Sequence, residues 1–247
     1  MIAATTRIAL GYTSMLVHSF VRRGLLRQED VRAALVRQIH FTGVRALPYV
    51  AAVALLFGAV AVTRTLAILG PENETALKAV VGGGVRELGP LVTALIVIVR
   101  SSVAIAAEVG LMRLRSSIDP ELLKGAADEE EVVLPRVLGV AIAAALLVSC
   151  FQFVAIASAL TATAFTLGTT LQTELEDFLV ATVWWQVPFS LAKGAMFGAG
   201  IAAISCYHGL HVENEVGDIP KAVVAACVGS LTFVLAADLF AVLLLLA

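Results

Sequence analysis

Charged side chains occur inside several long apolar segments of this chain, where they are unexpected. The five of most interest are Glu87, Arg100, Glu108, Lys193 and Asp238. A charge at the centre of a lipid bilayer costs about 2.5–3.5 kcal/mol on insertion scales, so such residues usually face a bundle interior or a water-filled cavity. We therefore expect these side chains to line a substrate cavity or a gate. The alternative interpretation is that they only hold helices together through ion pairs.

The spacing of these residues indicates their depth in a membrane. Glu87 and Glu108 are 21 positions apart, which is about 31 Å along an ideal helix and close to the thickness of the hydrocarbon layer. We expect the two carboxylates near opposite interfaces, with Arg100 nearer the middle and on roughly the same helix face as Glu108. Lys193 and Asp238 lie within other apolar runs, and each is expected to pair with the other, with Glu108 or with Arg100.

No set of residues is arranged for catalysis or for metal binding. The glycine-rich stretch VGGGVRELG at 81–89 lacks the GxxxxGK[ST] spacing of a nucleotide-binding loop. His208 and His211 are three residues apart, but no third ligand for a metal is in view. No basic patch interleaved with aromatic residues indicates nucleic-acid binding. We expect a chain without catalytic residues, metal or bound cofactor, so any energy for its work must come from a second chain or an ion gradient.

The elements that position the charged residues follow from the composition. Hydrophobic residues make up 60% of the 247 positions and charged residues 15%, and the mean hydropathy is +0.94. Soluble domains have about 45–50% apolar and about 25% charged residues. The sequence therefore predicts an all-α integral membrane protein.

Five apolar segments are long enough to cross a membrane. We predict spans at about 46–69, 78–112, 132–167, 179–207 and 222–246. Before the first span, residues 27–45 carry apolar side chains at helical spacing and an arginine-rich polar side, which is typical of an amphipathic helix lying in the membrane interface. The predicted organisation is a single domain, 1–247, with an interfacial arm at 1–45 and a transmembrane bundle at 46–247.

The distribution of basic residues predicts the orientation. Seven arginines lie within the first 45 residues, whereas the segment 168–178 has three acidic residues and no basic one. Lysine and arginine are enriched on the cytoplasmic side of membrane proteins. We expect the N-terminus and the charged segment 113–131 in the cytoplasm and the C-terminus on the opposite side.

Several stretches of the chain resemble the MlaE/YrbE family. They are FTGVRALPYV (41–50), VRELGPLVTALIVIVRSSVAIAAEVGLMR (85–113), VVLPRVLG (132–139), LAKGAMFGAGIAAISCYHGL (191–210) and the last span with Asp238. The resemblance is collinear over nearly the whole chain. Its most specific part is the block from Glu87 to Arg113.

The resemblance implies a function and a set of partners. Family members are permease subunits of ABC-type transporters that move phospholipid between the inner and outer membranes together with periplasmic MCE-domain proteins. It implies a homodimer or pseudo-dimer in the bacterial inner membrane, with phospholipid in a cavity at the dimer interface. ATP and Mg²⁺ would be bound by a separate ABC ATPase.

The resemblance also implies roles for individual residues. A cytoplasmic coupling helix between the second and third spans, from Arg113 to about Lys124, would dock onto the ATPase. Its contact residues would be Arg113, Arg115, Asp119 and Glu121. The intramembrane Glu, Lys and Asp of the family would correspond to Glu108, Lys193 and Asp238.

Two other functions remain open from the residues alone. The buried carboxylates and Lys193 could relay protons in an ion-coupled secondary transporter, although such transporters usually show an inverted repeat that this chain lacks. The chain could also be a membrane anchor that recruits MCE-domain proteins.

Overall fold

The computed structural model describes residues 29–70, 74–118, 129–181, 186–212 and 216–246. All regular elements in these ranges are helices, and five helical runs are long and apolar enough to cross a membrane. The predicted class, an all-α membrane protein with about five spans, is confirmed.

The helices follow the predicted spans closely. The first part of the chain forms α2 (Glu29–Ile39), the π-helical turn η2 (His40–Val44), α3 (Leu47–Leu69), α4 (Glu74–Val97), a second π-helical turn η3 (Ile98–Ser102) and α5 (Val103–Ile118). The second part forms α6 (Glu129–Leu167), α7 (Leu171–Ala181), α8 (Gln186–Leu210), the short 3₁₀ turn η4 (Val216–Asp218) and α9 (Ile219–Leu246).

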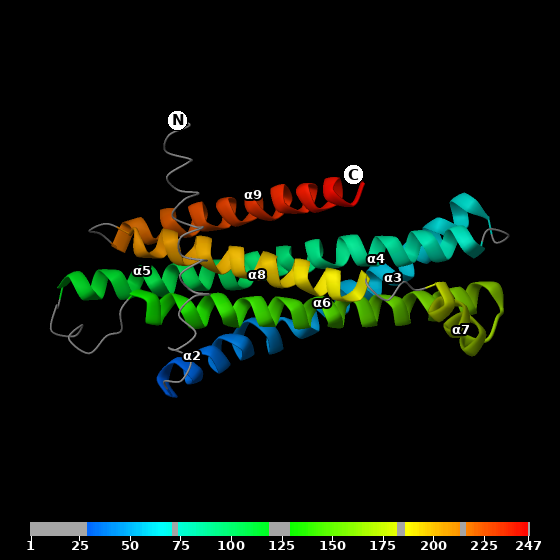
Figure 1. The fold of residues 1–247 in the computed structure, drawn as a ribbon, viewed down its shortest axis with the longest axis horizontal. Coiled ribbons are helices and arrows are strands. Elements are labelled where there is room, and N and C mark those ends of the chain that lie inside the picture. Colours follow the sequence, from blue (N-terminus) through cyan, green and yellow to red (C-terminus); the bar gives the residue numbers. More distant parts are fainter. Residues whose placement is uncertain (1–28, 71–73, 119–128, 182–185, 213–215, 247) are drawn as a thin grey trace.

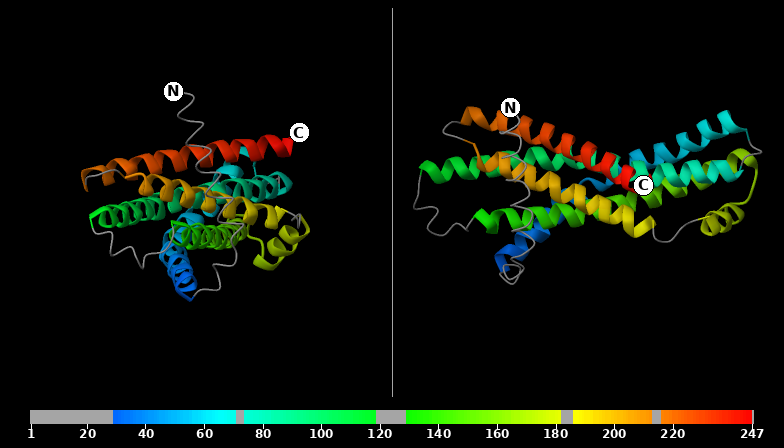
Figure 2. Two further views of the ribbon diagram at one scale, coloured as in Figure 1. Left: turned by 60° about the vertical axis from the view of Figure 1, so that its left-hand side comes forward. Right: turned by 45° about the horizontal axis from the view of Figure 1, so that its top comes forward.

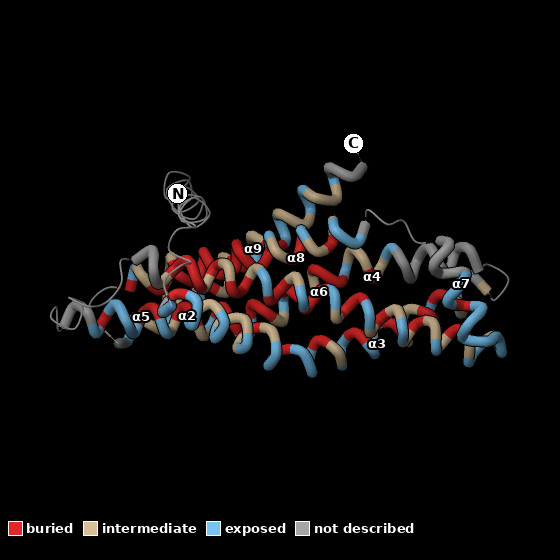
Figure 3. The backbone as a smooth tube through the Cα atoms, turned by 60° about the horizontal axis from the view of Figure 1, so that its bottom comes forward, coloured by how far each residue is buried: buried red, intermediate tan, exposed pale blue. Residues whose placement is uncertain are grey.

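Helix α6 is the centre of an elongated bundle. It packs on α3 along one side and on α8 along another, and α2 crosses it near its N-terminal end. Helix α9 packs on α8 and α5 at the edge of the bundle (Figures 1 and 2). Buried positions concentrate on α6, α8 and the facing parts of α5, whereas α9 leaves most of its surface uncovered (Figure 3). Exposed apolar side chains on a bundle of this kind are suited to contact lipid.

Helices α6 and α8 approach each other closely because glycine stands at the contact. A Cβ atom on Gly198 would lie 2.7 Å from the backbone oxygen of Val140 and 2.7 Å from the Cβ of Ala144. Gly194 lies one turn earlier on the same face and meets Val148. Small residues at four-residue spacing let membrane helices pack backbone to backbone, so these two helices form a tight pair.

The two π-helical turns lie next to each other in the bundle. Ser101 of η3 donates a hydrogen bond to Thr42 of η2, with 3.1 Å between the hydroxyl oxygens. Ser102 accepts a hydrogen bond of 2.9 Å from Ser205 of α8. All four side chains are buried. The bends in the first and second spans are therefore held together by a small cluster of hydroxyl groups.

The predicted start of the fourth span is wrong. Residues 171–181 form a separate helix, α7, and the span begins after it, with α8. Gly168, with φ of +71°, ends α6, as glycine often does in the left-handed conformation. The hydroxyl of Thr170 then accepts a bond from the backbone N–H of Thr173 at 3.4 Å, which is the pattern of an N-cap. A capped helix thus replaces the loop expected from the polar residues of this segment.

Candidate functional site

Three charged residues from three different helices meet at one point of the bundle. Lys193 Nζ on α8 lies 2.8 Å from Glu87 Oε2 on α4 and 2.8 Å from Asp238 Oδ1 on α9. The Lys193 side chain is 2% exposed, while Glu87 and Asp238 are 43% and 23% exposed. We call these residues the ionic triad.

The chain direction explains why the three residues share one depth. Glu87 and Lys193 lie near the beginnings of their spans, and Asp238 lies near the end of the last one. Each is four to six residues from the end of its span, or about 6–9 Å along a helix. Helices α4, α8 and α9 contact one another. Helices α4 and α8 run in the same direction and α9 runs in the opposite one, which brings the three residues to the same end of the membrane-crossing region (Figure 1).

The electrostatics of the ionic triad are asymmetric. A buried ammonium is tolerated only when it is paired and hydrogen-bonded, and Lys193 has two carboxylates within ion-pair distance. The formal charge of the triad is −1, and the carboxylates supply its exposed edge. A carboxylate that faces hydrocarbon is costly, so this edge fits the wall of a polar chamber better than a lipid-facing surface. The triad holds charge and hydrogen-bond acceptors, and contains no nucleophile poised by a base.

The predicted pairing of Lys193 with Asp238 is confirmed. The third member of the triad is Glu87, which the sequence had also predicted as a cavity or gate residue. Among the residues that the structure describes, no ion pair joins Lys193 to Glu108 or Asp238 to Arg100. Glu108 pairs with Arg136 instead, and its role as a cavity or gate residue stays a prediction.

Arg100 contacts the junction between η2 and α3. Its Nη1 donates a hydrogen bond to the backbone oxygen of Arg45, and its guanidinium carbon lies 4.9 Å from the ring centroid of Tyr49. Arg100 belongs to the π-helical turn η3, whose extra residue per turn changes the direction of the side chains that follow. This explains why Arg100 and Glu108 contact different partners, although a regular helix would place them on roughly one face.

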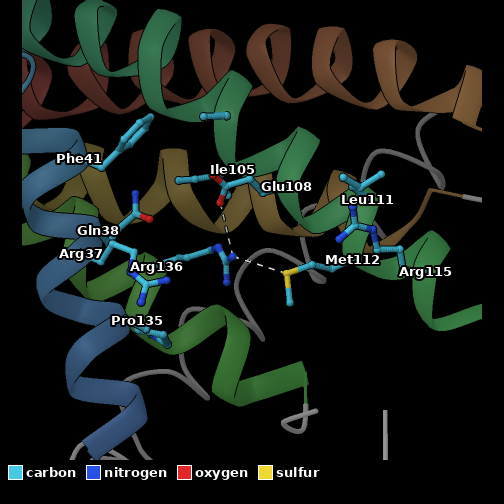
Figure 4. A pocket seen from close by; sticks show the side chains of 12 residues that line it. Arg37, Gln38, Phe41, Ile105, Glu108, Leu111, Met112, Arg115, Pro135 and Arg136 are labelled. Carbon is cyan, nitrogen blue, oxygen red and sulfur yellow. Dashed lines mark hydrogen bonds and ion pairs between the residues drawn. The ribbon is translucent and has the colours of Figure 1, made fainter. Parts of the chain in front are cut away.

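Glu108 belongs to a second polar cluster at the other end of the same span. Its Oε2 lies 3.6 Å from Nη2 of Arg136 on α6, and its side chain is 60% exposed. Both residues line a pocket of about 420 Å³ between α2, α5 and α6, together with Arg37 and Arg115 (Figure 4). Arg37 and Arg136 were missed as site residues by sequence reasoning. For Arg136, the sequence did contain a signal: this arginine lies only four residues inside the third predicted span, directly after Pro135.

The predicted coupling residues fall at the end of α5. Arg113 and Arg115 lie in its last turns and are exposed. Asp119 and Glu121 lie outside the described residues, so their role in contacting an ATPase stays a prediction.

Comparison with known proteins gives a consistent result. Residues 35–244 match the family described as Permease MlaE. The chain is 28% identical over 208 residues to a "Probable ABC transporter permease protein" of Rickettsia prowazekii, covering 81% of this chain and 78% of that protein. It is 26% identical over 239 residues to a protein of the same name in Rickettsia felis, covering 94% and 90%.

A plant protein is also similar. The chain is 29% identical over 154 residues to "Protein TRIGALACTOSYLDIACYLGLYCEROL 1, chloroplastic" of Arabidopsis thaliana, covering 62% of this chain and 44% of that protein. The five apolar spans, the charged residues at their ends and the match across residues 35–244 agree: this multi-pass membrane chain belongs to the MlaE permease family.

Proposed function

We propose that the chain is the permease subunit of an ATP-driven transporter that moves phospholipid between the inner and outer membranes. The family and the names of its bacterial relatives support an ABC-type permease. The Arabidopsis relative carries the name of a diacylglycerol lipid, which supports a lipid as the cargo. No catalytic role is assigned to this chain, and ATP and Mg²⁺ bind to a separate ATPase subunit.

The observation that carries the proposal is the half-exposed edge of the ionic triad. The Glu87 and Asp238 side chains are 43% and 23% exposed within the membrane-crossing region. A second copy of the chain, opposite this edge, would enclose a polar chamber for a phospholipid headgroup. In this homodimer, Glu87, Lys193 and Asp238 form part of the chamber wall.

The triad also has the geometry of a gate. Lys193 joins α4 and α9 through two separate ion pairs. A rigid movement of α9 away from α4 must lengthen one of them, while the other keeps the ammonium paired. Lys193 could therefore stay neutralised while α9 moves. Arg100, which joins η3 to the first span, and Glu108, in the half of the second span away from Glu87, connect such movement to the ATPase side.

The partners follow from this arrangement. The ABC ATPase contacts the end of α5 through Arg113 and Arg115 and the segment that contains Asp119 and Glu121. That end and the N-terminus are cytoplasmic, and the C-terminus of α9 is periplasmic, where an MCE-domain protein receives or delivers the lipid. The membrane is the bacterial inner membrane.

The proposal is tested by co-purification and reconstitution. The chain is expressed with its neighbouring ATPase and MCE-domain proteins, and bound phospholipid is measured after solvent extraction. ATP hydrolysis is then measured with and without added phospholipid. We expect co-purified phospholipid and lipid-dependent hydrolysis in the wild type. Both are lost in Lys193→Ala and kept in Lys221→Ala, which removes an exposed lysine paired with Asp218 at the opposite end of the last span.

Three results contradict the proposal. If no ATPase co-purifies and lipid never changes hydrolysis, the chain is not an ABC permease subunit. Uptake of lipid by the chain alone, driven by a pH step across liposomes, indicates an ion-coupled transporter. Unchanged lipid transport in both Lys193→Ala and Glu108→Ala indicates an anchor for MCE-domain proteins.

A further inference from the structure

The pocket between α2, α5 and α6 is chemically different from the ionic triad. Its charged lining residues are Arg37, Arg115, Arg136 and Glu108, which give a formal charge of +2. Glu87 lies near one end of the second span, and the pocket lies near the other end. A net positive pocket and a net negative triad at opposite ends of one span are suited to different ligands.

Arg136 has unused hydrogen-bonding capacity in this pocket. Its Nη1 donates to the backbone oxygen of Val132 at 2.9 Å, and its Nη2 lies 3.6 Å from Glu108. Its Nε is buried and has no hydrogen-bond partner among the described residues. Figure 4 shows the guanidinium directed across the pocket toward Glu108. On the pocket side, Nη2 also donates to Met112 Sδ at 3.7 Å, and a thioether sulfur is only a weak acceptor. An oxyanion in the pocket would be a stronger acceptor for this group.

Arg37 is available to the same ligand. It is exposed on α2 and forms no ion pair within the described part of the chain. Arginine is well suited to phosphate because its planar group donates two parallel hydrogen bonds. Arg37 from α2 and Arg136 from α6 could therefore hold one phosphate between two helices.

The remaining walls of the pocket are apolar and lead onto an apolar surface. Phe41, Ile105, Leu111 and Met112 line the pocket beside the arginines. Leu111 is also one of several exposed apolar residues of η3 and α5, together with Val99 and Val103. Val99 is 72% exposed. A cationic pocket with apolar walls, beside exposed apolar residues of η3 and α5, matches an amphiphile with an anionic head better than a soluble anion.

We propose that this pocket binds the phosphate headgroup of an anionic phospholipid from the leaflet at the α2 end of the bundle. The headgroup contacts Arg37 and Arg136, and an acyl chain lies along Val99, Val103 and Leu111. The bound lipid joins α2 to α5 and α6, and so fixes the interfacial helix against the bundle. This resident site is separate from the transport chamber proposed above and does not depend on it.

The test is lipid binding by the full-length chain, measured by native mass spectrometry from detergent with phosphatidylglycerol or phosphatidylcholine added. We expect the wild type to retain phosphatidylglycerol preferentially. Arg37→Gln and Arg136→Gln should each weaken this retention about tenfold, as expected for the loss of a charge-assisted hydrogen bond. Arg32→Gln is the matched control, since it removes an exposed arginine of the same helix that does not line this pocket.

Several outcomes overturn the proposal. Equal retention of the two lipids by the wild type excludes an anionic-lipid site, and an equal loss in Arg32→Gln indicates only diffuse attraction to a basic helix. Displacement of the lipid by excess inorganic phosphate assigns the pocket to a soluble anion. If Arg37→Gln keeps phosphatidylglycerol but loses a co-purifying ATPase, the pocket is a protein-docking site. Should Arg136→Gln fail to fold, the exposed Arg37 decides the outcome alone.

Discussion

Lys193 Nζ lies 2.8 Å from Asp238 Oδ1, and this contact joins α8 to the last helix of the chain. Lys193 lies near the start of α8 and Asp238 near the end of α9, and the two helices run in opposite directions. Helix α9 packs on the bundle with little of its surface buried. An ionic contact near its C-terminal end therefore contributes strongly to its position.

The first prediction concerns the loss of this ammonium. Lys193→Ala leaves two carboxylates close together without a counter-ion. Removing one partner of a buried ion pair lowers the free energy of unfolding by about 3–5 kcal/mol. Because Glu87 and Asp238 are partly exposed, we expect a loss near the lower end of this range. Unfolding in mixed micelles by a denaturing detergent measures it. Lys221→Ala is the control, and a similar loss in both variants would exclude a special role for Lys193.

The second prediction compares the two carboxylates of the triad. Asp238 is less exposed than Glu87, so its ion pair with Lys193 is less screened by solvent. Asp238→Asn should therefore lower the stability of the chain more than Glu87→Gln, by about 1 kcal/mol. The same unfolding assay measures both variants. The reverse order would mean that α4, and not α9, depends more on Lys193.

The third prediction concerns the close contact of α6 and α8. A methyl group at Gly198 meets the Val140 backbone oxygen at 2.7 Å, so Gly198→Ala must push the helices apart, at a cost of about 1–3 kcal/mol. Gly83 in α4 has no atom within 4 Å of such a methyl group. Gly83→Ala should raise helix stability by up to about 1 kcal/mol. Thermal unfolding of both variants should show changes of opposite sign, and equal signs would contradict the packing.

The fourth prediction concerns Arg100 and Tyr49. Their cation–π geometry, with 4.9 Å between the guanidinium carbon and the ring centroid, should give a coupling energy of about 0.5–1 kcal/mol at this partly exposed site. A double-mutant cycle with Arg100→Ala and Tyr49→Ala measures it. Additive effects of the two substitutions would show that the contact carries no energy of its own.

The sequence predicted how deep each residue lies in the membrane better than it predicted which residues contact one another. The apolar segments defined the five spans. The fourth span begins later than the predicted residue 179, because Thr170 caps a separate helix that the polar composition concealed. The spacing of Glu87 and Glu108 agrees with the structure, which places them toward opposite ends of one span. Depth follows from the distance along a helix, which the sequence contains directly.

The neighbours of a residue depend on how each helix is rotated, and this is where the sequence prediction failed. The π-helical turn η3 lies between Glu87 and Glu108, so their relative directions could not be derived from a regular period of 3.6 residues. The pocket around Arg136 depends on the crossing of α2 over α6. No local pattern in either segment predicts that contact.

The contact at Gly198 has a mechanical consequence. Helix α8 lies against α6 almost without intervening side chains, and sliding one along the other would drive Cβ atoms of neighbouring residues into backbone. Interiors packed this tightly resist continuous deformation. The two central helices must therefore translate or tilt together as one rigid unit, so changes of shape fall to the peripheral helices α2 and α9.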